Sequence, residues 1–342
     1  MSGGDFSDAL KAIVAGRTLG ADESARAFAA IMAGEVSQVR IAAFLTALAQ
    51  REPSVEEITG AALAMRAAMR KVTAPPNAMD IVGTGGDGHD TFNISTATAL
   101  TVAASGVPVA KHGNRSATSR TGTADVLERL GVKIDIAPAT AEACLREAGI
   151  CFLFAPAYHS AMKHVAPVRK ELGFRTIFNF LGPLSNPAGV RRELLGVSAA
   201  DWVEKLAHVL KALGTEKAWV VRGSDGLDEL TTTGITHVAI LDAGRVTLRE
   251  VMPDEIGVPR VPLSALKGGE PEENAAALSA LLEGAKGAFR DAVLLNAAAA
   301  LVVADKAADL PAGAKLAACA IDSGAAKATL ARMAQVSQRP AP

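Results

Sequence analysis

The sequence predicts an α/β protein of two domains: a small all-helical domain, then a larger α/β domain with a mainly parallel central sheet. Its 342 residues exceed what one hydrophobic core usually serves, so two domains are expected. Residues 5–71 show only helical periodicity, whereas short apolar runs alternate with helices from Met79 onward. Such alternation is typical of a parallel sheet covered by helices on both faces.

The amino-terminal region is predicted to contain helices and no strand. Apolar residues between Ile41 and Leu48 repeat at helical spacing. Ser54 and Glu57 form a capping-box pattern that predicts the start of another helix. The two prolines in the segment 71–77 stop that helix and extend the chain, so we interpret this segment as a linker between domains.

Strands and helices are predicted in turn over the rest of the chain. Strands are expected at 80–82, 107–110, 151–154, 193–198, 217–222, 236–241 and 245–251. Helices are expected at 93–105, 121–130, 140–149, 201–213, 273–283, 288–304 and 322–336. The strands 236–241 and 245–251 are separated only by a short turn, which predicts a hairpin. Residues 252–272 are rich in proline and glycine and are expected to be irregular.

A glycine-rich segment, Gly83–Gly88, follows the first predicted strand and carries the strongest functional signal. Four of its six residues are glycine, and without Cβ atoms peptide N–H groups can approach an anion closely. Asn93, Ser95 and Thr96 follow at the start of a helix, where the first amide donors are unpaired and phosphate binds well. Lys111, after the second predicted strand, adds a mobile positive charge. Together these features predict a polyphosphate site.

Simpler interpretations exist for each feature taken alone. The glycine cluster can be a tight turn, and any one of the Ser, Thr and Asn residues can be a helix cap. Gly83, Gly85 and Gly88 match the spacing of a dinucleotide site, but the helix starts too late and the next strand ends in Lys111 rather than an acid. No Gly-Lys-Ser/Thr sequence closes the segment, so it is not a P-loop.

The segment from Met79 to Asp125 resembles the anthranilate phosphoribosyltransferase family. That family carries a GTGGD loop, an NIST helix start and a KHGNRS segment followed by a SADVL-like helix. All three occur here in that order, the last as Thr123-Ala124-Asp125-Val126-Leu127. The similarity continues through KHVAPVRKELGFRTIFN and spans nearly the whole chain.

The resemblance implies the arrangement of the domains. It implies a nucleoside phosphorylase-like phosphoribosyltransferase plan, in which part of the later chain returns to the helical domain. We therefore expect a small helical domain of residues 1–73, joined by part of about 165–188. The large phosphoribosyl-diphosphate-binding domain is then expected to comprise residues 78–164 and 189–342.

The resemblance also implies the reaction. The amine of anthranilate displaces diphosphate from C1 of 5-phosphoribosyl diphosphate and gives N-(5-phosphoribosyl)anthranilate, a step of tryptophan biosynthesis. The leaving group is already acidic and metal-bound, so catalysis depends on positioning and on neutralising charge, assisted by Mg²⁺. No residue is expected to act as a catalytic acid or base, and no Ser/His/Asp or paired-carboxylate arrangement is evident.

Site residues are carried over from the family motifs. Phosphoribosyl diphosphate is expected to contact Gly83, Gly86, Asp87, Thr91, Asn93, Ile94, Ser95, Thr96, Lys111, His112, Gly113, Asn114, Arg115, Ser116, Ala117, Thr118, Ser119 and Thr123. Anthranilate is expected at Gly83, Asn114 and Arg169, and magnesium at Ser95, Asp228 and Glu229. The family often has serine at the positions of Thr118 and Thr123, where threonine keeps the hydroxyl group.

Two of these assignments depend on the resemblance. Adjacent acids such as Asp228 and Glu229 suit magnesium, but taken alone such a pair is more often a solvated turn. Arg169 can hold a carboxylate through two parallel hydrogen bonds, whereas without the resemblance an ion pair with Glu171 or another surface acid is favoured.

Composition limits the partners and the compartment. The net charge is −1 and no Lys/Arg block occurs, so neither nucleic acid nor a membrane surface is expected as a partner. Three cysteines without close spacing argue against a disulfide framework or a zinc site. The first residues lack a signal-peptide pattern, so we expect a reducing cytoplasm. The resemblance implies a homodimer through the helical domain.

Two other functions remain open. A pyrimidine nucleoside phosphorylase shares the expected domain plan and a phosphate-binding glycine loop, although the NIST helix start and the acidic pair favour the transferase. A non-catalytic relative that binds nucleic acid would show a basic groove and eroded metal ligands, in contrast to the net charge of −1 and the intact Asp228 and Glu229.

Overall fold

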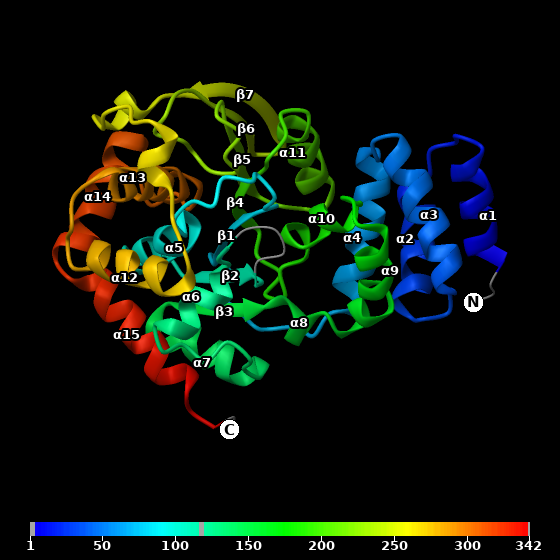
Figure 1. The fold of residues 1–342 in the computed structure, drawn as a ribbon, viewed down its shortest axis with the longest axis horizontal. Helices are drawn as coiled ribbons and strands as arrows, with labels where there is room; N and C mark the ends of the chain where they lie inside the picture. The colour runs from blue at the N-terminus through cyan, green and yellow to red at the C-terminus, as the bar shows by residue number, and fades with distance from the viewer. Residues whose placement is uncertain (1–3, 116–119, 341–342) are drawn as a thin grey trace.

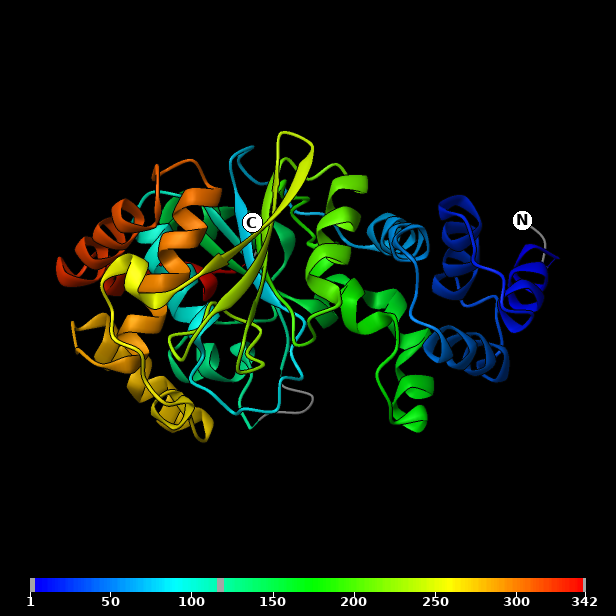
Figure 2. The same cartoon turned by 90° about the horizontal axis from the view of Figure 1, so that it is seen from above.

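The computed structural model describes residues 4–115 and 120–340. A helical bundle lies at one end of the elongated molecule and a larger α/β body at the other (Figures 1 and 2). The bundle begins with α1 (Gly4–Val14), α2 (Ala21–Met32), α3 (Gln38–Gln50) and α4 (Val55–Ala68). Among the described residues, no helix has the length and apolar character needed to cross a membrane.

The α/β body is built on one seven-stranded sheet of order β3-β2-β1-β4-β5-β6-β7. The first five strands along the chain are parallel, and β6 and β7 are antiparallel additions at one edge. The predicted mainly parallel sheet and its terminal hairpin are therefore confirmed. The strands are β1 (Met79–Gly83), β2 (Val109–Gly113), β3 (Ile150–Phe154), β4 (Arg192–Gly196), β5 (Lys217–Gly223), β6 (Thr236–Asp242) and β7 (Arg245–Val251).

Successive side chains of the central strands enter two different hydrophobic cores. Leu194 of β4 packs with the helices of the α/β body, whereas the next residue, Leu195, packs in a core that continues into the helical bundle. This follows from the period of two along a strand. The helices of the α/β body are α5 (Ile94–Ala104), α6 (Thr123–Arg129), α7 (Pro138–Ala148), α11 (Trp202–Ala212), α12 (Pro271–Leu282), α13 (Ala288–Val303), α14 (Leu310–Asp322) and α15 (Ala325–Ser337).

Helix α14 was not expected from the sequence. Its first turns contain Pro311 and Gly313, which both lower helix propensity. The glycine is explained by packing, because a Cβ at this position would lie 2.8 Å from the Cα of Ala298 in α13. Asp309 accepts a hydrogen bond from the Ala312 N–H at 2.8 Å and so begins the helix.

The segment between β3 and β4 returns to the helical bundle. It forms α8 (Ala155–Tyr158), η1 (Ser160–His164), α9 (Ala166–Leu172), α10 (Phe178–Leu181) and η2 (Pro183–Ser185). Helix α9 packs against α3, and Val168 and Phe178 belong to the same core as the bundle. The expected domain limits themselves stay a prediction.

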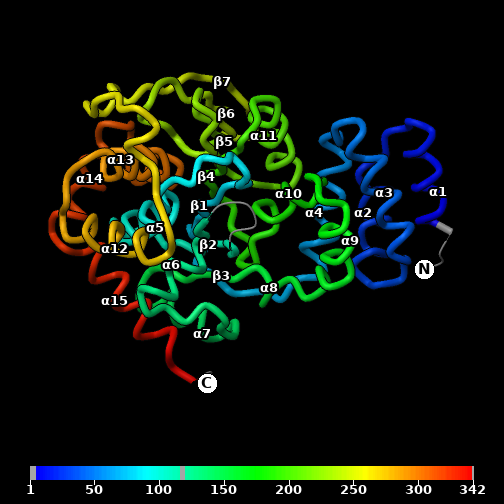
Figure 3. Tube along the Cα trace, in the orientation of Figure 1, coloured from blue at the N-terminus to red at the C-terminus, as the bar shows by residue number. Residues whose placement is uncertain are grey.

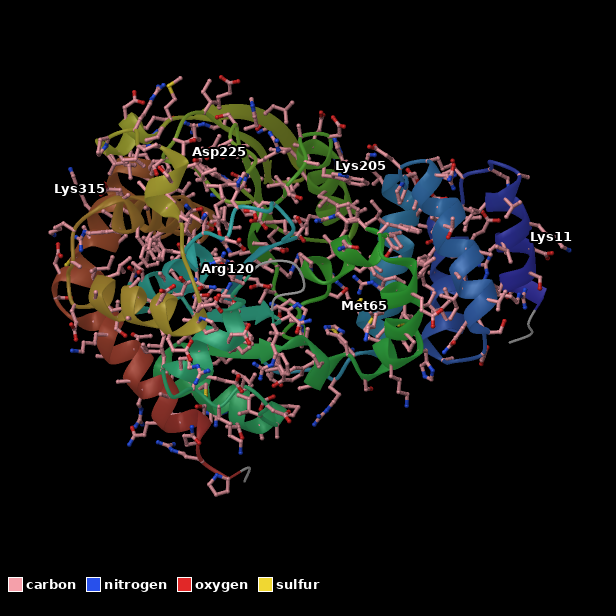
Figure 4. All side chains as sticks on the ribbon, in the orientation of Figure 1. Lys11, Met65, Arg120, Lys205, Asp225 and Lys315 are labelled. Atoms are coloured by element: carbon pink, nitrogen blue, oxygen red, sulfur yellow. The ribbon has the colours of Figure 1, made fainter. Side chains whose placement is uncertain are left out.

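Tight contacts connect the bundle to the α/β body. Met65 of α4 is buried in the core that both parts share and lies on the side of the bundle nearest the body (Figure 4). The linker is also held, because the Val72 N–H donates to the Pro187 carbonyl at 3.0 Å and the Thr73 N–H donates to Glu142 at 2.8 Å.

Glu57 organises the helical bundle from a fully buried position. Its carboxylate accepts hydrogen bonds from the N–H groups of Leu19 and Ser54, each at 2.9 Å, and pairs with both terminal nitrogens of Arg51. The expected capping box is present, since Ser54 also accepts from the Glu57 N–H. Burial acts to raise the pKa of Glu57, but the hydrogen bonds from Arg51, Leu19 and Ser54 outweigh it and lower that pKa.

We predict that Glu57→Gln destabilises the protein by about 2–4 kcal/mol, because an amide leaves Arg51 and one buried N–H without a partner. The exposed neighbour supplies the control, and Glu56→Gln should change stability by less than about 0.5 kcal/mol. The folded pKa is lowered, so this stabilisation is present above the usual glutamate pKa and is lost as the pH falls through the folded value. Urea unfolding at neutral and acid pH measures both effects, and equal stability of the two variants at neutral pH would contradict the prediction.

Candidate functional site

Several predicted site residues lie at or near the carboxyl ends of the parallel strands. Gly83 ends β1, Gly113 ends β2 and Gly223 ends β5, and these ends lie on the same edge of the sheet. This is the edge where open α/β sheets bind their ligands. In Figure 3 the strands lie between α12, α13, α14 and α15 on one side and α9 and α10, next to the helical bundle, on the other.

The glycine loop after β1 adopts left-handed backbone angles. Gly85, Gly86 and Gly88 have φ angles of 65°, 75° and 76°, which residues with a Cβ rarely adopt. The Gly85 N–H is already engaged, because it donates to Oδ2 of Asp228 at 2.7 Å. Within residues 4–115 and 120–340, the N–H groups of Gly86, Asp87 and Gly88 have no acceptor. These three consecutive amides are the part of the loop that can cradle an anion.

Two glycines make room for Asp228. A Cβ at Gly83 would lie 2.3 Å from Oδ2 of Asp228, and a Cβ at Gly196 would lie 1.6 Å from its carbonyl oxygen. The ends of β1 and β4 therefore need glycine so that the loop after β5 can cross them. The glycine pattern at Gly83 has a packing cause as well as the expected role in binding.

The acidic pair lies in a strongly negative environment. Burial and the nearby carboxylate of Asp87 raise the pKa of Asp228 to about 6. Burial and the charge of Asp228 raise the pKa of Glu229 well above its usual range. Carboxylates held this close favour a bound cation, which would relieve their repulsion. The pair is therefore partly buried rather than a fully solvated turn, and its role in holding a metal stays a prediction.

The donor set fits magnesium with incomplete protein ligation. No cluster of three or more His, Cys, Asp or Glu side chains arranged for a metal occurs in the described part of the chain. Magnesium commonly takes one or two carboxylates and completes its shell with water and substrate phosphates. Asp228 and Glu229 supply such carboxylates, and the Ser95 hydroxyl belongs to the same cluster because Lys111 donates to it at 3.2 Å.

Lys111 joins this cluster to the sheet. It is 3% exposed, and its Nζ donates to the Ile81 carbonyl at 2.6 Å. Burial lowers the pKa of Lys111, while Asp80, Glu229 and Asp228 act against that shift. The sequence predicted a mobile positive charge, but the structure shows a buried and fixed one. The ammonium group of Lys111 attracts a phosphate over a distance, and strand β2 fixes the position of that charge.

The start of helix α5 presents polar groups toward the same edge. Thr96 is buried, and its hydroxyl donates to Oγ1 of Thr123 at the start of α6, at 3.2 Å. Asn93 is the N-cap residue, yet its side chain makes no capping bond and its Oδ1 accepts from Asn274 instead. The Ile94 side chain is buried in the core, so only its backbone can serve the site. Thr91 forms an isolated bridge with Lys267.

The last residues of β2 and the segment after it contain several predicted site residues that make structural contacts. His112 is buried, with Nδ1 3.0 Å from the Gly182 carbonyl and Nε2 3.2 Å from Nε2 of His159. Burial and His159 lower the pKa of His112 to about 3, so the ring is neutral and both nitrogens are occupied. Arg115 pairs with Asp125 and Glu128. These side chains hold local structure, and their expected contact with phosphoribosyl diphosphate stays a prediction.

Gly113 at the end of β2 and Asn114 after it are two further predicted site residues that the structure describes. Asn114 is exposed, and its Oδ1 accepts from the Arg115 N–H at 2.8 Å, while Gly113 is half-buried against Phe152. The expected site residues Ser116, Ala117, Thr118 and Ser119 lie outside the described residues.

Arg169 lies on α9 and forms no ion pair with an acid of residues 4–115 and 120–340. It is half-buried, and its guanidinium group lies 5.7 Å from the ring centre of Phe178. Burial lowers its pKa, and among the described residues no acid lies within ion-pair distance, so the alternative of a pair with Glu171 is not found. A desolvated cation without a counter-charge is costly unless a ligand provides one.

Arg175 is a site residue that the sequence interpretation did not include. Its Nη1 donates to the Gly85 carbonyl at 3.0 Å, and a Cβ at Gly86 would lie 1.8 Å from the same nitrogen. The residue follows α9, so it links the segment that carries Arg169 directly to the glycine loop. Only its place in the GFRT stretch, six residues after Arg169, could have indicated it.

Comparison with known proteins identifies the family. Residues 7–69 match the helical bundle domain of a glycosyl transferase family, and residues 75–327 match the a/b domain of that family. An anthranilate phosphoribosyltransferase of Parvibaculum lavamentivorans is 59% identical over 329 residues, which cover 96% of each chain. The crystal structure of the Thermus thermophilus enzyme superposes with a TM-score of 0.93 at 46% identity, covering 97% of this chain and 100% of that one.

Two structures of the Saccharomyces cerevisiae enzyme are also similar. One is in complex with PRPP and Mg and the other with 4-fluoroanthranilate. Their TM-scores are 0.90 and 0.88, at 28% and 27% identity, and each covers 98% of both chains. The predicted fold class, a helical bundle with a mostly parallel α/β domain, is confirmed by these matches. The chain belongs to the anthranilate phosphoribosyltransferase family.

Proposed function

We propose that this chain transfers the phosphoribosyl group of phosphoribosyl diphosphate to the amine of anthranilate, the family's step in tryptophan biosynthesis. The observation that carries the proposal is a pair of unlike features, one at the carboxyl edge of the sheet and one on α9, in the segment from which Arg175 contacts the glycine loop. A loop of unpaired amides beside a carboxylate pair suits a magnesium-bound diphosphate. An unpaired guanidinium on α9 suits an aromatic carboxylate.

Loss of anthranilate fluorescence tests this function. We expect the fluorescence to fall only when phosphoribosyl diphosphate and Mg²⁺ are both present. Phosphorolysis of thymidine or uridine, without consumption of anthranilate, would instead support a pyrimidine nucleoside phosphorylase. Binding of single-stranded DNA at moderate salt, without turnover, would support the non-catalytic alternative.

The diphosphate half of the site is assigned to the loop and the sheet edge. The N–H groups of Gly86, Asp87 and Gly88 bind phosphate oxygens, together with the polar groups at the start of α5. Asp228 and Glu229, with Ser95, would hold Mg²⁺, which supplies charge neutralisation for the departing diphosphate. Lys111 adds a fixed positive potential from inside the sheet. The yeast structure with PRPP and Mg supports this assignment.

The acceptor half is assigned to α9. Arg169 grips the carboxylate of anthranilate, and Gly83 and Asn114 lie on the opposite side near its amine. The yeast structure with 4-fluoroanthranilate supports an acceptor of this class. Catalysis then consists of holding the amine in line with C1, which requires no acid or base from the chain.

We further propose that the protein is a homodimer formed through the helical bundle. We also propose that it resides in the cytoplasm. Val14 of α1 and Val39 of α3 are 67% and 80% exposed, and each is an apolar side chain that a second bundle would cover. The three free cysteines fit a reducing compartment. Sedimentation analysis tests the assembly, and a monomer at micromolar concentration would contradict it.

The variant Asp228→Asn/Glu229→Gln should lose turnover by about 100-fold or more, because it removes the charge expected to hold Mg²⁺. Its melting temperature should be equal to or above that of the wild type, since the folded state no longer holds repelling carboxylates.

A second adjacent acidic pair provides the matched control. Asp254→Asn/Glu255→Gln changes acids of η3 (Pro253–Ile256) and should leave magnesium-dependent turnover unchanged. Steady-state rates against Mg²⁺ concentration and calorimetric melting make the comparison. Normal magnesium dependence in the first variant would remove Asp228 and Glu229 from the metal site.

Arg169→Ala should raise the Michaelis constant for anthranilate by about 10- to 150-fold, which corresponds to the loss of a charge-assisted hydrogen bond. The constant for phosphoribosyl diphosphate should change far less. Arg169→Lys should recover only part of the affinity, because a point charge does not reproduce the planar fork. The exposed neighbour gives the control, Lys170→Ala, which should behave as the wild type. Equal effects on both substrates would place Arg169 outside the acceptor site.

A further inference from the structure

Asn274 of helix α12 contacts Asn93, a residue of the proposed substrate site. It lies in the first turns of α12, is 2% exposed, and is distant in sequence from every assigned site residue. Its Nδ2 donates to Oδ1 of Asn93 at 2.9 Å. Its Oδ1 accepts from the Gly269 N–H at 2.8 Å.

These two bonds fix the orientation of the Asn93 amide. The Gly269 N–H can only donate, so the atom of Asn274 that faces it must be the carbonyl oxygen. The other side of Asn274 is then the NH₂ group, and the atom of Asn93 that receives it must be Oδ1. Asn93 therefore turns its own NH₂ group away from Asn274. That group has no protein partner in the described part of the chain, and Asn93 is partly exposed.

The surrounding backbone holds Asn274 in this position. The Phe92 N–H donates to the Leu266 carbonyl at 3.0 Å, and the Gly268 N–H donates to the Asp90 carbonyl at 2.8 Å. A Cβ at Gly268 would lie 2.6 Å from Oδ1 of Asn274, so the residue before Gly269 must be small. Residues 266–268, before α12, are therefore hydrogen-bonded to residues 90–92, before α5.

We propose that Asn274 is a positioning residue that presents the Asn93 NH₂ group as a hydrogen-bond donor to the oxygen atoms of phosphoribosyl diphosphate. An amide free to turn would offer Oδ1 to the anion for part of the time, and that contact is repulsive. The inference rests on the proposed function, because it requires Asn93 to contact this substrate. It adds a residue that acts only through Asn93.

A double-mutant cycle tests the coupling. Asn274→Ala and Asn93→Ala should each raise the Michaelis constant for phosphoribosyl diphosphate by about 5- to 10-fold, the effect of one hydrogen bond. The constant for anthranilate should stay near the wild-type value in both variants. Adding Asn274→Ala to Asn93→Ala should have no further effect, since the residue through which it acts is gone. Ser279→Ala, further along α12, is the control and should match the wild type.

Asn274→Asp provides a second variant that keeps the shape and the bond to Gly269. A carboxylate can only accept, so the Asn93 amide should reverse and turn Oδ1 toward the substrate. The Michaelis constant for phosphoribosyl diphosphate should then rise at least as much as in Asn274→Ala. Circular dichroism confirms that each variant is folded.

The outcomes separate this inference from the proposed function. Additive effects of the two alanine substitutions, equal effects on both substrates, or a wild-type constant in Asn274→Asp would overturn the role of Asn274. Each of these results is obtained on an enzyme that still consumes anthranilate, so the proposed function would stand. Absence of turnover in the wild type would overturn both.

Discussion

The buried ammonium group of Lys111 is the interaction on which the site depends. It donates to the Ile81 carbonyl of the neighbouring strand and to the Ser95 hydroxyl at the start of α5. Its charge is shared among Asp80 within the sheet and the acidic pair Asp228 and Glu229 above it. One cation cannot balance three carboxylates in a desolvated place, so burial raises the pKa values of all three acids. A magnesium ion with its diphosphate would complete this arrangement, which explains why a protein would keep acids whose pKa values are raised by burial.

The second cation comes from the helical bundle. Glu193 of β4 lies beside Asp80 in the register of the parallel strands, and burial with this like charge raises its pKa well above the usual range. Arg66 of α4 acts against that shift, while its Nε donates to the Leu184 carbonyl at 2.7 Å. The bundle therefore contributes charge to the sheet as well as apolar contact. The segment between β3 and β4 carries both Arg169 and Arg175, and Arg175 donates to the Gly85 carbonyl of the glycine loop. This one segment therefore connects the acceptor half of the proposed site to the diphosphate half.

The sequence predicted the fold class and most elements because periodicity and glycine breaks are local signals. It did not predict α14, whose Gly313 makes sense only beside α13. Motif matching indicated the glycine loop. It did not indicate that the Gly85 N–H donates a hydrogen bond to Asp228, which lies in a distant part of the sequence. Lys111 was interpreted as mobile because a sequence does not show burial. Asn274 carried no motif at all, since its role arises from one contact across the fold.

A crystal structure with Mg²⁺, phosphoribosyl diphosphate and a fluorinated anthranilate tests the central claim most directly. The account predicts diphosphate oxygens on the N–H groups of Gly86 to Gly88, the metal on Asp228 and Glu229, and the anthranilate carboxylate on Arg169. Diphosphate bound away from the glycine loop, with the acidic pair free of metal, would contradict it.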